Sequence, residues 1–128
     1  MKRLLIDTNI YSYAMMGDPV TVSILRQADI IGISSISIGE LLSGFKGGSR
    51  EASNRTQLCE FLDSPRVRLY GIDEDTAEFY ADILNRLRKA GTPIPTNDIW
   101  IAAVAFQFGL KLFTKAHHFS YIPGLMRV

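Results

Sequence analysis

The sequence is poor in the residues that build disulfide or zinc frameworks, because its 128 residues include one cysteine and two histidines. The single Cys59 cannot form an internal disulfide, which favours a reducing compartment such as the cytoplasm, and we expect this side chain to be buried. No His-rich or Cys-rich spacing suited to zinc is present. The composition therefore argues against a disulfide-linked scaffold and against a zinc-binding framework.

The chain also lacks a strong excess of charge and any long hydrophobic run. Its 14 Lys and Arg residues nearly balance 13 Asp and Glu residues, for a net charge of +1. Bulk charge therefore gives no sign of a nucleic-acid-binding domain, and any RNA binding must come from local geometry. The apolar run Ile99–Phe106 is far shorter than the ~20 residues that cross a bilayer. Leu4–Ile6 is too short for a signal-peptide core, so we expect a soluble protein with no membrane span.

Short apolar runs alternate with helical patterns along the whole chain. An apolar fraction of 47% at this length is enough for one continuous core, so we expect residues 1–128 to form a single domain. Strands are predicted at 3–6, 30–33, 67–72 and 111–114, with a short fifth strand at 125–128, and helices at 8–16, 19–28, 37–45, 49–62, 73–90 and 97–108. The alternation predicts an α/β fold, a three-layer αβα sandwich around a short, mostly parallel sheet of four to five strands.

Three carboxylates stand at junctions between predicted elements, and each has a structural explanation of its own. Asp7 follows the first strand and would cap the next helix. Ser37 and Glu40 have the spacing of a capping box, in which the glutamate bonds back to the cap residue. Asp98 lies in the first turn of a helix, where the dipole favours an acid by about 0.3–1 kcal/mol. Taken singly, each acid is better explained as a helix cap than as a catalyst.

Their shared placement is what indicates chemistry. Positions that follow parallel strands gather at the carboxyl edge of the sheet, where ligands bind. Three carboxylates in one cleft would raise each other's pKa unless a cation held them. Carboxylate oxygens are hard ligands, which favours Mg²⁺ or Mn²⁺. Because such an ion lowers the pKa of a bound water and stabilises charge on a leaving oxygen, the pattern predicts phosphodiester hydrolysis.

Four segments together resemble the PIN domain, and within it the VapC-type toxin ribonucleases of VapBC toxin–antitoxin systems. The first two segments are the strand and acid of Leu4–Ile10 and the stretch Ser34–Leu41. The third, Gly91–Ala103, is the most specific, because its loop, acid and small-residue helix occur in the family's order. The fourth, Thr114–Phe119, keeps the framing Thr and Phe but has Ala116 where the family often has an acid. The resemblance spans nearly the whole chain.

The resemblance implies an endoribonuclease in which Asp7, Glu40 and Asp98 hold Mg²⁺ or Mn²⁺ and a metal-activated water attacks RNA. We expect Asp7 and Asp98 to be the nearer ligands, with Glu40 binding through a water or orienting the nucleophile. Ala116 favours a one-metal site, or a second ion that binds only together with RNA. Four polar residues could orient the metal-binding carboxylates: Asn9, Asn97, Thr114 and His118. The first three could equally be ordinary hydrogen-bonding groups of loops. His118 could partly substitute for the missing acid, although a histidine in a polar loop is more often a surface or hydrogen-bonded residue.

The resemblance also implies partners. It predicts a homodimer, and a higher hetero-oligomer with a VapB-type antitoxin whose tail occupies a groove beside the active site. Basic side chains could position RNA phosphates in the same cleft, and aromatic side chains could stack on bases, although their helical spacing is equally typical of a core. These candidates are the basic residues Lys46, Arg50, Arg55 and Lys115 and the aromatic residues Tyr11, Tyr13 and Trp100.

Two other functions fit part of the pattern. A phosphatase of the haloacid-dehalogenase type also opens with an acid after its first strand, but it needs a second acid two residues later, where this chain has Asn9. A non-catalytic PIN-like module that binds RNA or a protein would explain Ala116. It predicts RNA binding without metal-stimulated turnover.

Overall fold

The computed structural model describes residues 1–128 and is built on a parallel sheet. The strands are β1 (Arg3–Ile6), β2 (Ile30–Ser34), β3 (Val67–Tyr70) and β4 (Lys111–Phe113), and they pair in the order β3-β2-β1-β4. The helices are α1 (Thr8–Met15), α2 (Pro19–Arg26), α3 (Ser35–Gly47), α4 (Glu51–Leu62), α5 (Glu74–Ala90) and α6 (Thr96–Phe108), followed by the 3₁₀ helix η1 (His117–Tyr121). The predicted α/β fold is confirmed. The predicted fifth strand is reduced to one bridge between Leu112 and Arg127.

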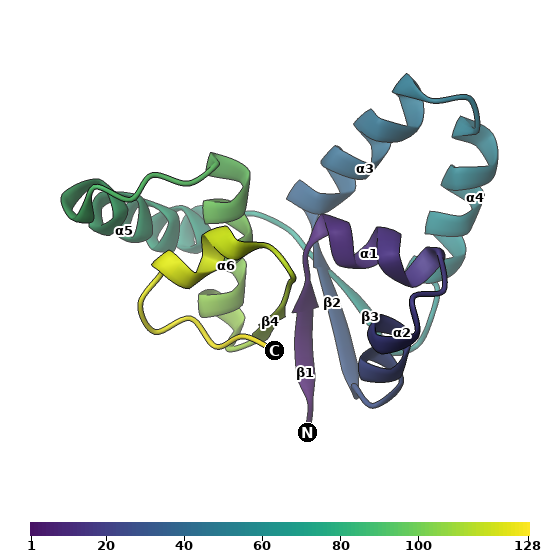
Figure 1. The fold of residues 1–128 in the computed structure, drawn as a ribbon, viewed down its shortest axis with the longest axis horizontal. Coiled ribbons are helices and arrows are strands. Elements are labelled where there is room, and N and C mark those ends of the chain that lie inside the picture. The colour runs from purple at the N-terminus through teal and green to yellow at the C-terminus, as the bar shows by residue number, and fades with distance from the viewer.

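The alternating side chains of β1 divide the core between the two faces of the sheet. Leu4 and Ile6 pack with residues of α1, α2, α3 and α4, whereas Leu5 packs with residues of α5, α6 and the C-terminal segment. Successive side chains of a strand point to opposite faces, so an uninterrupted apolar strand requires cover on both sides. Figure 1 shows the result as helices on either side of the sheet. The three predicted layers are therefore present.

Helix α6 is the central element of the layer that carries Asp98. Every residue from Ile101 to Ala105 is at most 1% exposed, and Ile99 is completely buried. A helix that is apolar on all sides must be surrounded by protein, and here α5 and β4 enclose it. Its C-terminal Gly109 has a φ of 63°, the left-handed conformation that glycine adopts most easily, as the sequence predicts. Asp98 therefore lies in the first turn of α6, directly before its buried part.

The start of α3 differs from the prediction. The helix begins at Ser35 and is capped by Ser34, whose hydroxyl accepts a hydrogen bond from the Ser37 N–H. Ser37, the predicted cap, lies inside the helix, fully buried, and its own hydroxyl has no hydrogen-bond partner. The predicted capping box between Ser37 and Glu40 is therefore wrong. Glu40 lies in the second turn of α3 and is free for another role.

The end of β3 and the exposure of Cys59 also differ from the sequence-based predictions. Strand β3 ends at Tyr70 rather than at Ile72, because its partner β2 ends at Ser34, which pairs with Tyr70. Cys59 is exposed on α4, so the expectation that it is buried is wrong. None of the helices combines the length and the apolar character needed to cross a bilayer.

Candidate active site

The candidate site lies where the order of the strands reverses. From β1 the chain builds β2 and then β3 on one side, and β4 joins β1 on the other side. Asp7 directly follows β1 and Thr114 directly follows β4, and the Thr114 hydroxyl donates a hydrogen bond of 2.5 Å to Asp7 Oδ2. Ligands of open α/β sheets bind at such topological switch points, beyond the carboxyl ends of the strands.

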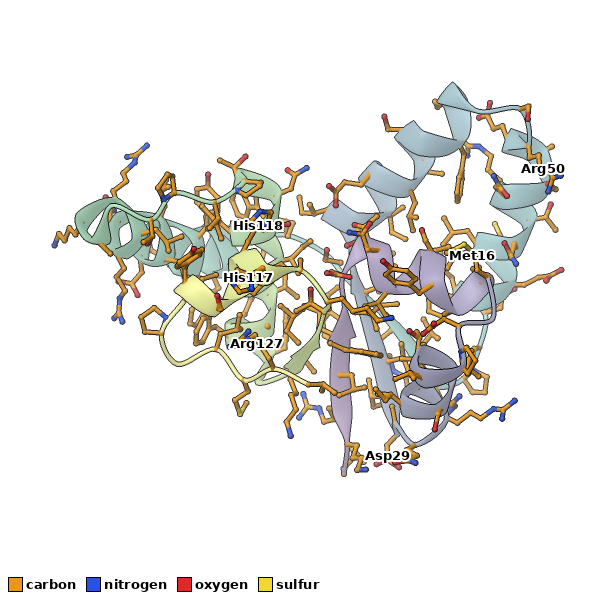
Figure 2. The ribbon with its side chains drawn as sticks, in the orientation of Figure 1. Met16, Asp29, Arg50, His117, His118 and Arg127 are labelled. Atoms are coloured by element: carbon orange, nitrogen blue, oxygen red, sulfur yellow. The ribbon has the colours of Figure 1, made fainter.

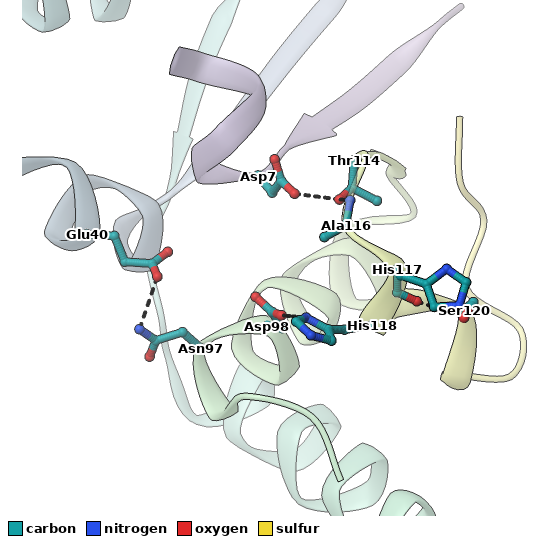
Figure 3. Close-up of polar contacts among 9 residues, drawn as sticks. All are labelled: Asp7, Glu40, Asn97, Asp98, Thr114, Ala116, His117, His118 and Ser120. Carbon is teal, nitrogen blue, oxygen red and sulfur yellow. Dashed lines mark hydrogen bonds and ion pairs between the residues drawn. The ribbon is translucent and has the colours of Figure 1, made fainter. Parts of the chain in front are cut away.

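A cavity of about 400 Å³ opens at this point. It brings together the three predicted acids, although they are 33 and 58 residues apart along the chain, because β1, α3 and α6 all present them at the same edge. Figure 3 shows Asp7, Glu40 and Asp98 arranged around this space. The lining residues are Asp7, Thr8, Asn9, Glu40, Pro95, Thr96, Asn97, Asp98, Ile101, Ala116 and His118.

Asp7 is the most deeply buried of the acids, at 4% exposure. Its Oδ1 accepts a hydrogen bond of 2.9 Å from the Ile10 N–H, so the predicted helix cap is confirmed. Burial raises the pKa of the Asp7 carboxyl. The hydrogen bonds from Thr114 and Ile10 oppose that shift, while the nearby carboxylates of Asp98 and Glu40 add to it. A capping role and a place in the site are thus both satisfied by this one side chain.

Glu40 is held by donors from two other helices. The Thr8 hydroxyl on α1 donates a hydrogen bond of 2.5 Å to Oε1, and the Asn97 amide on α6 donates one of 3.4 Å to Oε2. Neither contact involves the backbone at the start of α3. The side chain of Glu40 is therefore directed to the cavity and not to a helix terminus.

Asp98 is paired with His118 from η1. The His118 Nδ1 lies 3.0 Å from Asp98 Oδ2. Burial raises the pKa of the Asp98 carboxyl; the hydrogen bond and charge of His118 lower it, and the Glu40 carboxylate raises it. Figure 3 shows His118 joined to Asp98 in this site. Its neighbour His117 instead packs edge-on against Tyr121. The fourth segment of the resemblance therefore reaches the site through His118.

The donor set fits a hard divalent cation. No three His, Cys, Asp or Glu side chains stand close enough together in this arrangement to hold one ion between them. However, an ionised carboxylate has about four lone-pair sites, so the present hydrogen bonds leave sites on Asp7, Glu40 and Asp98 for a cation. The like charges that raise the pKa of Asp7 and Asp98 are what a cation would offset. Asp7, Glu40 and Asp98 are thus the residues that could hold Mg²⁺ or Mn²⁺.

The groups predicted to orient the acids do lie beside them. Thr114 bonds to Asp7, Asn97 to Glu40 and His118 to Asp98, and Asn9 lines the same cavity. Sequence reasoning missed Thr8, which donates to Glu40. No local pattern could have revealed it, because its partner lies 32 residues away.

The basic residues proposed for RNA phosphates do not line this cavity. Lys46 and Arg55 both pair with Glu51 at the junction of α3 and α4. Arg50 lies at the tip of that hairpin, away from His118 (Figure 2). Lys115 pairs with Asp18 and sits 4.2 Å above the Tyr13 ring.

The aromatic candidates serve mainly in packing. Tyr11 is 2% exposed and packs edge-on against Phe61. Trp100 stacks on Tyr80, with ring centroids 3.9 Å apart. The core alternative therefore holds for Tyr11.

Comparison with known proteins identifies the family and agrees with the fold. A family model described as PIN domain matches residues 4–125. Ribonuclease VapC1 of Haemophilus influenzae is 33% identical over 114 residues, which cover 86% of this chain and 84% of that protein. The crystal structure of VapBC2 from Rickettsia felis, bound to a DNA fragment from its promoter, is similar with a TM-score of 0.87 and 26% identity, covering 98% of this chain and 96% of that one. A toxin–antitoxin complex from Klebsiella pneumoniae is similar with a TM-score of 0.73 and 25% identity, covering 96% and 95% of the two chains.

Proposed function

The chain belongs to the PIN domain family, and we propose that it is a metal-dependent endoribonuclease, the toxin of a VapBC-type toxin–antitoxin pair. Relatives named as VapC ribonucleases support the nuclease activity. The observation that carries the proposal is the convergence of Asp7, Glu40 and Asp98 on one cavity at the switch point of the sheet. Hydrogen bonding at a helix terminus accounts for Asp7 but leaves the placement of Glu40 unexplained.

Each residue of the site has a distinct part in the proposed reaction. When bound, Mg²⁺ or Mn²⁺ supplies an activated water and offsets charge on the scissile phosphate. Asp7 and Asp98 would hold the cation directly, and Thr114 and His118 fix the orientation of these two carboxylates through their hydrogen bonds. Glu40 faces the same cavity, where it would bind the cation through the attacking water, orient that water and accept its proton at a carboxylate oxygen. As the water oxygen bonds to phosphorus, the bond from phosphorus to one ribose oxygen breaks, and that oxygen leaves as a hydroxyl after taking up a proton from solvent.

The proposal extends to partners and location. Structures of VapBC and other toxin–antitoxin complexes share this fold, which supports an antitoxin as the binding partner. We further propose that the chain forms a homodimer, assembles with its antitoxin into a larger hetero-oligomer and acts on RNA in the cytoplasm.

A non-catalytic PIN-like module remains the second candidate because of one observation. Ala116 lines the cavity where the family often has an acid, so the site has three carboxylates rather than four. The phosphatase alternative has no comparable support, since Asn9 lines the cavity where that mechanism needs a carboxylic acid. The two remaining functions differ in turnover, which can be measured.

The test is cleavage of structured RNAs by the purified protein in EDTA and in excess Mn²⁺. We expect cleavage only with Mn²⁺, and none by Asp98→Asn. Asp63→Asn is the matched control, because Asp63 is an exposed acid at the end of α4, outside the cavity. Cleavage in EDTA at the same rate would overturn the metal-dependent mechanism. Tight RNA binding without any Mn²⁺-stimulated turnover would instead establish the non-catalytic module.

A further inference from the structure

The two donors that hold Glu40 each stand next to one of the other two acids in the sequence. Thr8 directly follows Asp7, and Asn97 directly precedes Asp98. The neighbours of Asp7 and Asp98 in the sequence thus both donate hydrogen bonds to Glu40. The Asn97 hydrogen bond also joins the two helical layers, because α3 packs on one face of the sheet and α6 on the other, whereas the Thr8 hydrogen bond joins α1 and α3 within one layer. Figure 3 shows the Asn97 contact spanning the gap between α3 and α6.

Glu40 needs such support more than the other acids do. Its side chain has one more rotatable bond than that of Asp7 or Asp98, and it is only partly buried, so packing alone does not fix it. Glu40 also shares the cavity with two like charges, and its carboxylate raises the pKa of both Asp7 and Asp98. Without donors, that repulsion would favour rotamers that carry the Glu40 carboxylate out into solvent.

We propose that Thr8, assisted by Asn97, is a positioning residue that holds the Glu40 carboxylate at the cavity and thereby sets the affinity of the site for a divalent cation. This inference rests on the proposed function, since it assumes that the cavity binds Mg²⁺ or Mn²⁺. Thr8 is the stronger of the two donors, because its bond is 2.5 Å long and partly buried, whereas that of Asn97 is 3.4 Å long and exposed. Partners that orient a metal-binding side chain commonly affect metal affinity by about 10–100-fold.

The alternative is that Thr8 only supports the fold at the start of α1. The two roles differ in what they require of the side chain. Positioning requires the hydroxyl group. Thr8→Ser keeps the hydroxyl and should still position Glu40, whereas Thr8→Val keeps the shape of the side chain but lacks the hydroxyl and should not. A purely structural role would depend on the shape and would affect the melting temperature without acting through Glu40.

The experiment measures Mn²⁺ binding by electron paramagnetic resonance in the absence of RNA, together with the melting temperature of each variant in EDTA. We expect Thr8→Val to weaken Mn²⁺ binding about tenfold or more, and Thr8→Ser to stay close to wild type. Thr8→Ala also lacks the hydroxyl and should weaken Mn²⁺ binding as much as Thr8→Val does. It replaces Thr8→Val in the test if that variant does not fold. Thr56→Val is the control, since Thr56 is an exposed threonine of α4 that donates only to the Ala52 carbonyl.

A double-mutant cycle with Glu40→Gln tests whether Thr8 affects Mn²⁺ affinity through Glu40. We expect Thr8→Val to cause no further loss of Mn²⁺ affinity once Glu40 is replaced. The inference is overturned if Thr8→Val binds Mn²⁺ like wild type, if Thr8→Ser loses as much affinity as Thr8→Val, or if the full loss persists beside Glu40→Gln. A wild-type protein that binds no Mn²⁺ would overturn the metal dependence in the proposed function and, with it, this inference.

Discussion

Asp7→Asn should stabilise the metal-free protein while abolishing RNA cleavage. The Asp7 carboxyl is 4% exposed and shares its cavity with two other acids. Its pKa is raised from the usual value of 3.8 mainly by burial, and the hydrogen bonds from Thr114 and Ile10 do not reverse that shift. The folded protein therefore prefers the neutral carboxyl, which asparagine imitates in shape. The Asn side-chain oxygen can still accept from the Ile10 N–H, so the cap of α1 is retained.

The sign and size of the effect follow from linkage between protonation and folding. A carboxyl with a raised pKa contributes stability that is fully present below 3.8 and is lost as the pH rises through the folded-state value. At pH 7 the ionised Asp7 is thus a cost to stability. We expect Asp7→Asn to raise stability at pH 7 by on the order of 1 kcal/mol, the usual scale of a single substitution, which is roughly 3–5 °C in melting temperature for a domain of this size. The gain should shrink toward pH 4.

Mn²⁺ should reverse the order of the two proteins. A cation at 100 times its dissociation constant stabilises the protein that binds it by about 2.7 kcal/mol, which exceeds the gain from the substitution. Thermal unfolding followed by circular dichroism, in EDTA and in Mn²⁺, measures both effects. Asp63→Asn is the control for removing an exposed negative charge. If Asp7→Asn melts below wild type in EDTA at pH 7, or gains as much from Mn²⁺ as wild type, the reasoning about this carboxyl is refuted.

Two further substitutions test the surroundings of the acids. Ala116→Asp should destabilise the protein in EDTA by on the order of 1 kcal/mol, because it adds a like charge to the cavity, and should therefore lower the melting temperature. The same substitution should increase the stabilisation by Mn²⁺. An unchanged Mn²⁺ response would show that position 116 does not face the ion. His118→Ala removes the hydrogen bond and charge that lower the pKa of Asp98, so the pH midpoint of Mn²⁺ binding should move upward. His117→Ala is the matched control, and a midpoint that stays in place for His118→Ala would contradict the role of the contact between His118 and Asp98.

The elements that could be predicted from the sequence are those whose ends are determined locally. Gly91 and Gly109 end α5 and α6 with positive φ angles of 69° and 63°, and a glycine after an apolar helix is a local signal. The start of α3 could not be predicted, because Ser34, Ser35 and Ser37 all stand at the junction of β2 and α3, and the last residue of β2 is determined by the pairing of Ser34 with Tyr70. Strand pairing therefore determines where α3 begins. Because the helix begins at Ser35, Glu40 lies in its second turn and is not part of a capping box.

The candidate site likewise has residues that local sequence predicts and residues that depend on tertiary contacts. Asp7, Glu40 and Asp98 could be identified because each stands at or near a junction between a strand or loop and a helix, and parallel strands bring such junctions to one edge. Thr8 could not be identified, since nothing within α1 indicates that its hydroxyl reaches an acid on α3. Conversely, Lys46 and Arg55 look like an RNA-binding cluster in the sequence, but in the structure both are paired with Glu51.

The most direct test of the central claim is the chemical identity of the RNA ends that wild-type protein produces with Mn²⁺. Hydrolysis by a water held at Asp7, Glu40 and Asp98 breaks the phosphodiester without using the ribose 2′-hydroxyl, so the products should carry only linear phosphate and free hydroxyl ends. Products with 2′,3′-cyclic phosphate, formed equally well in EDTA, would show attack by the 2′-hydroxyl and would contradict the account.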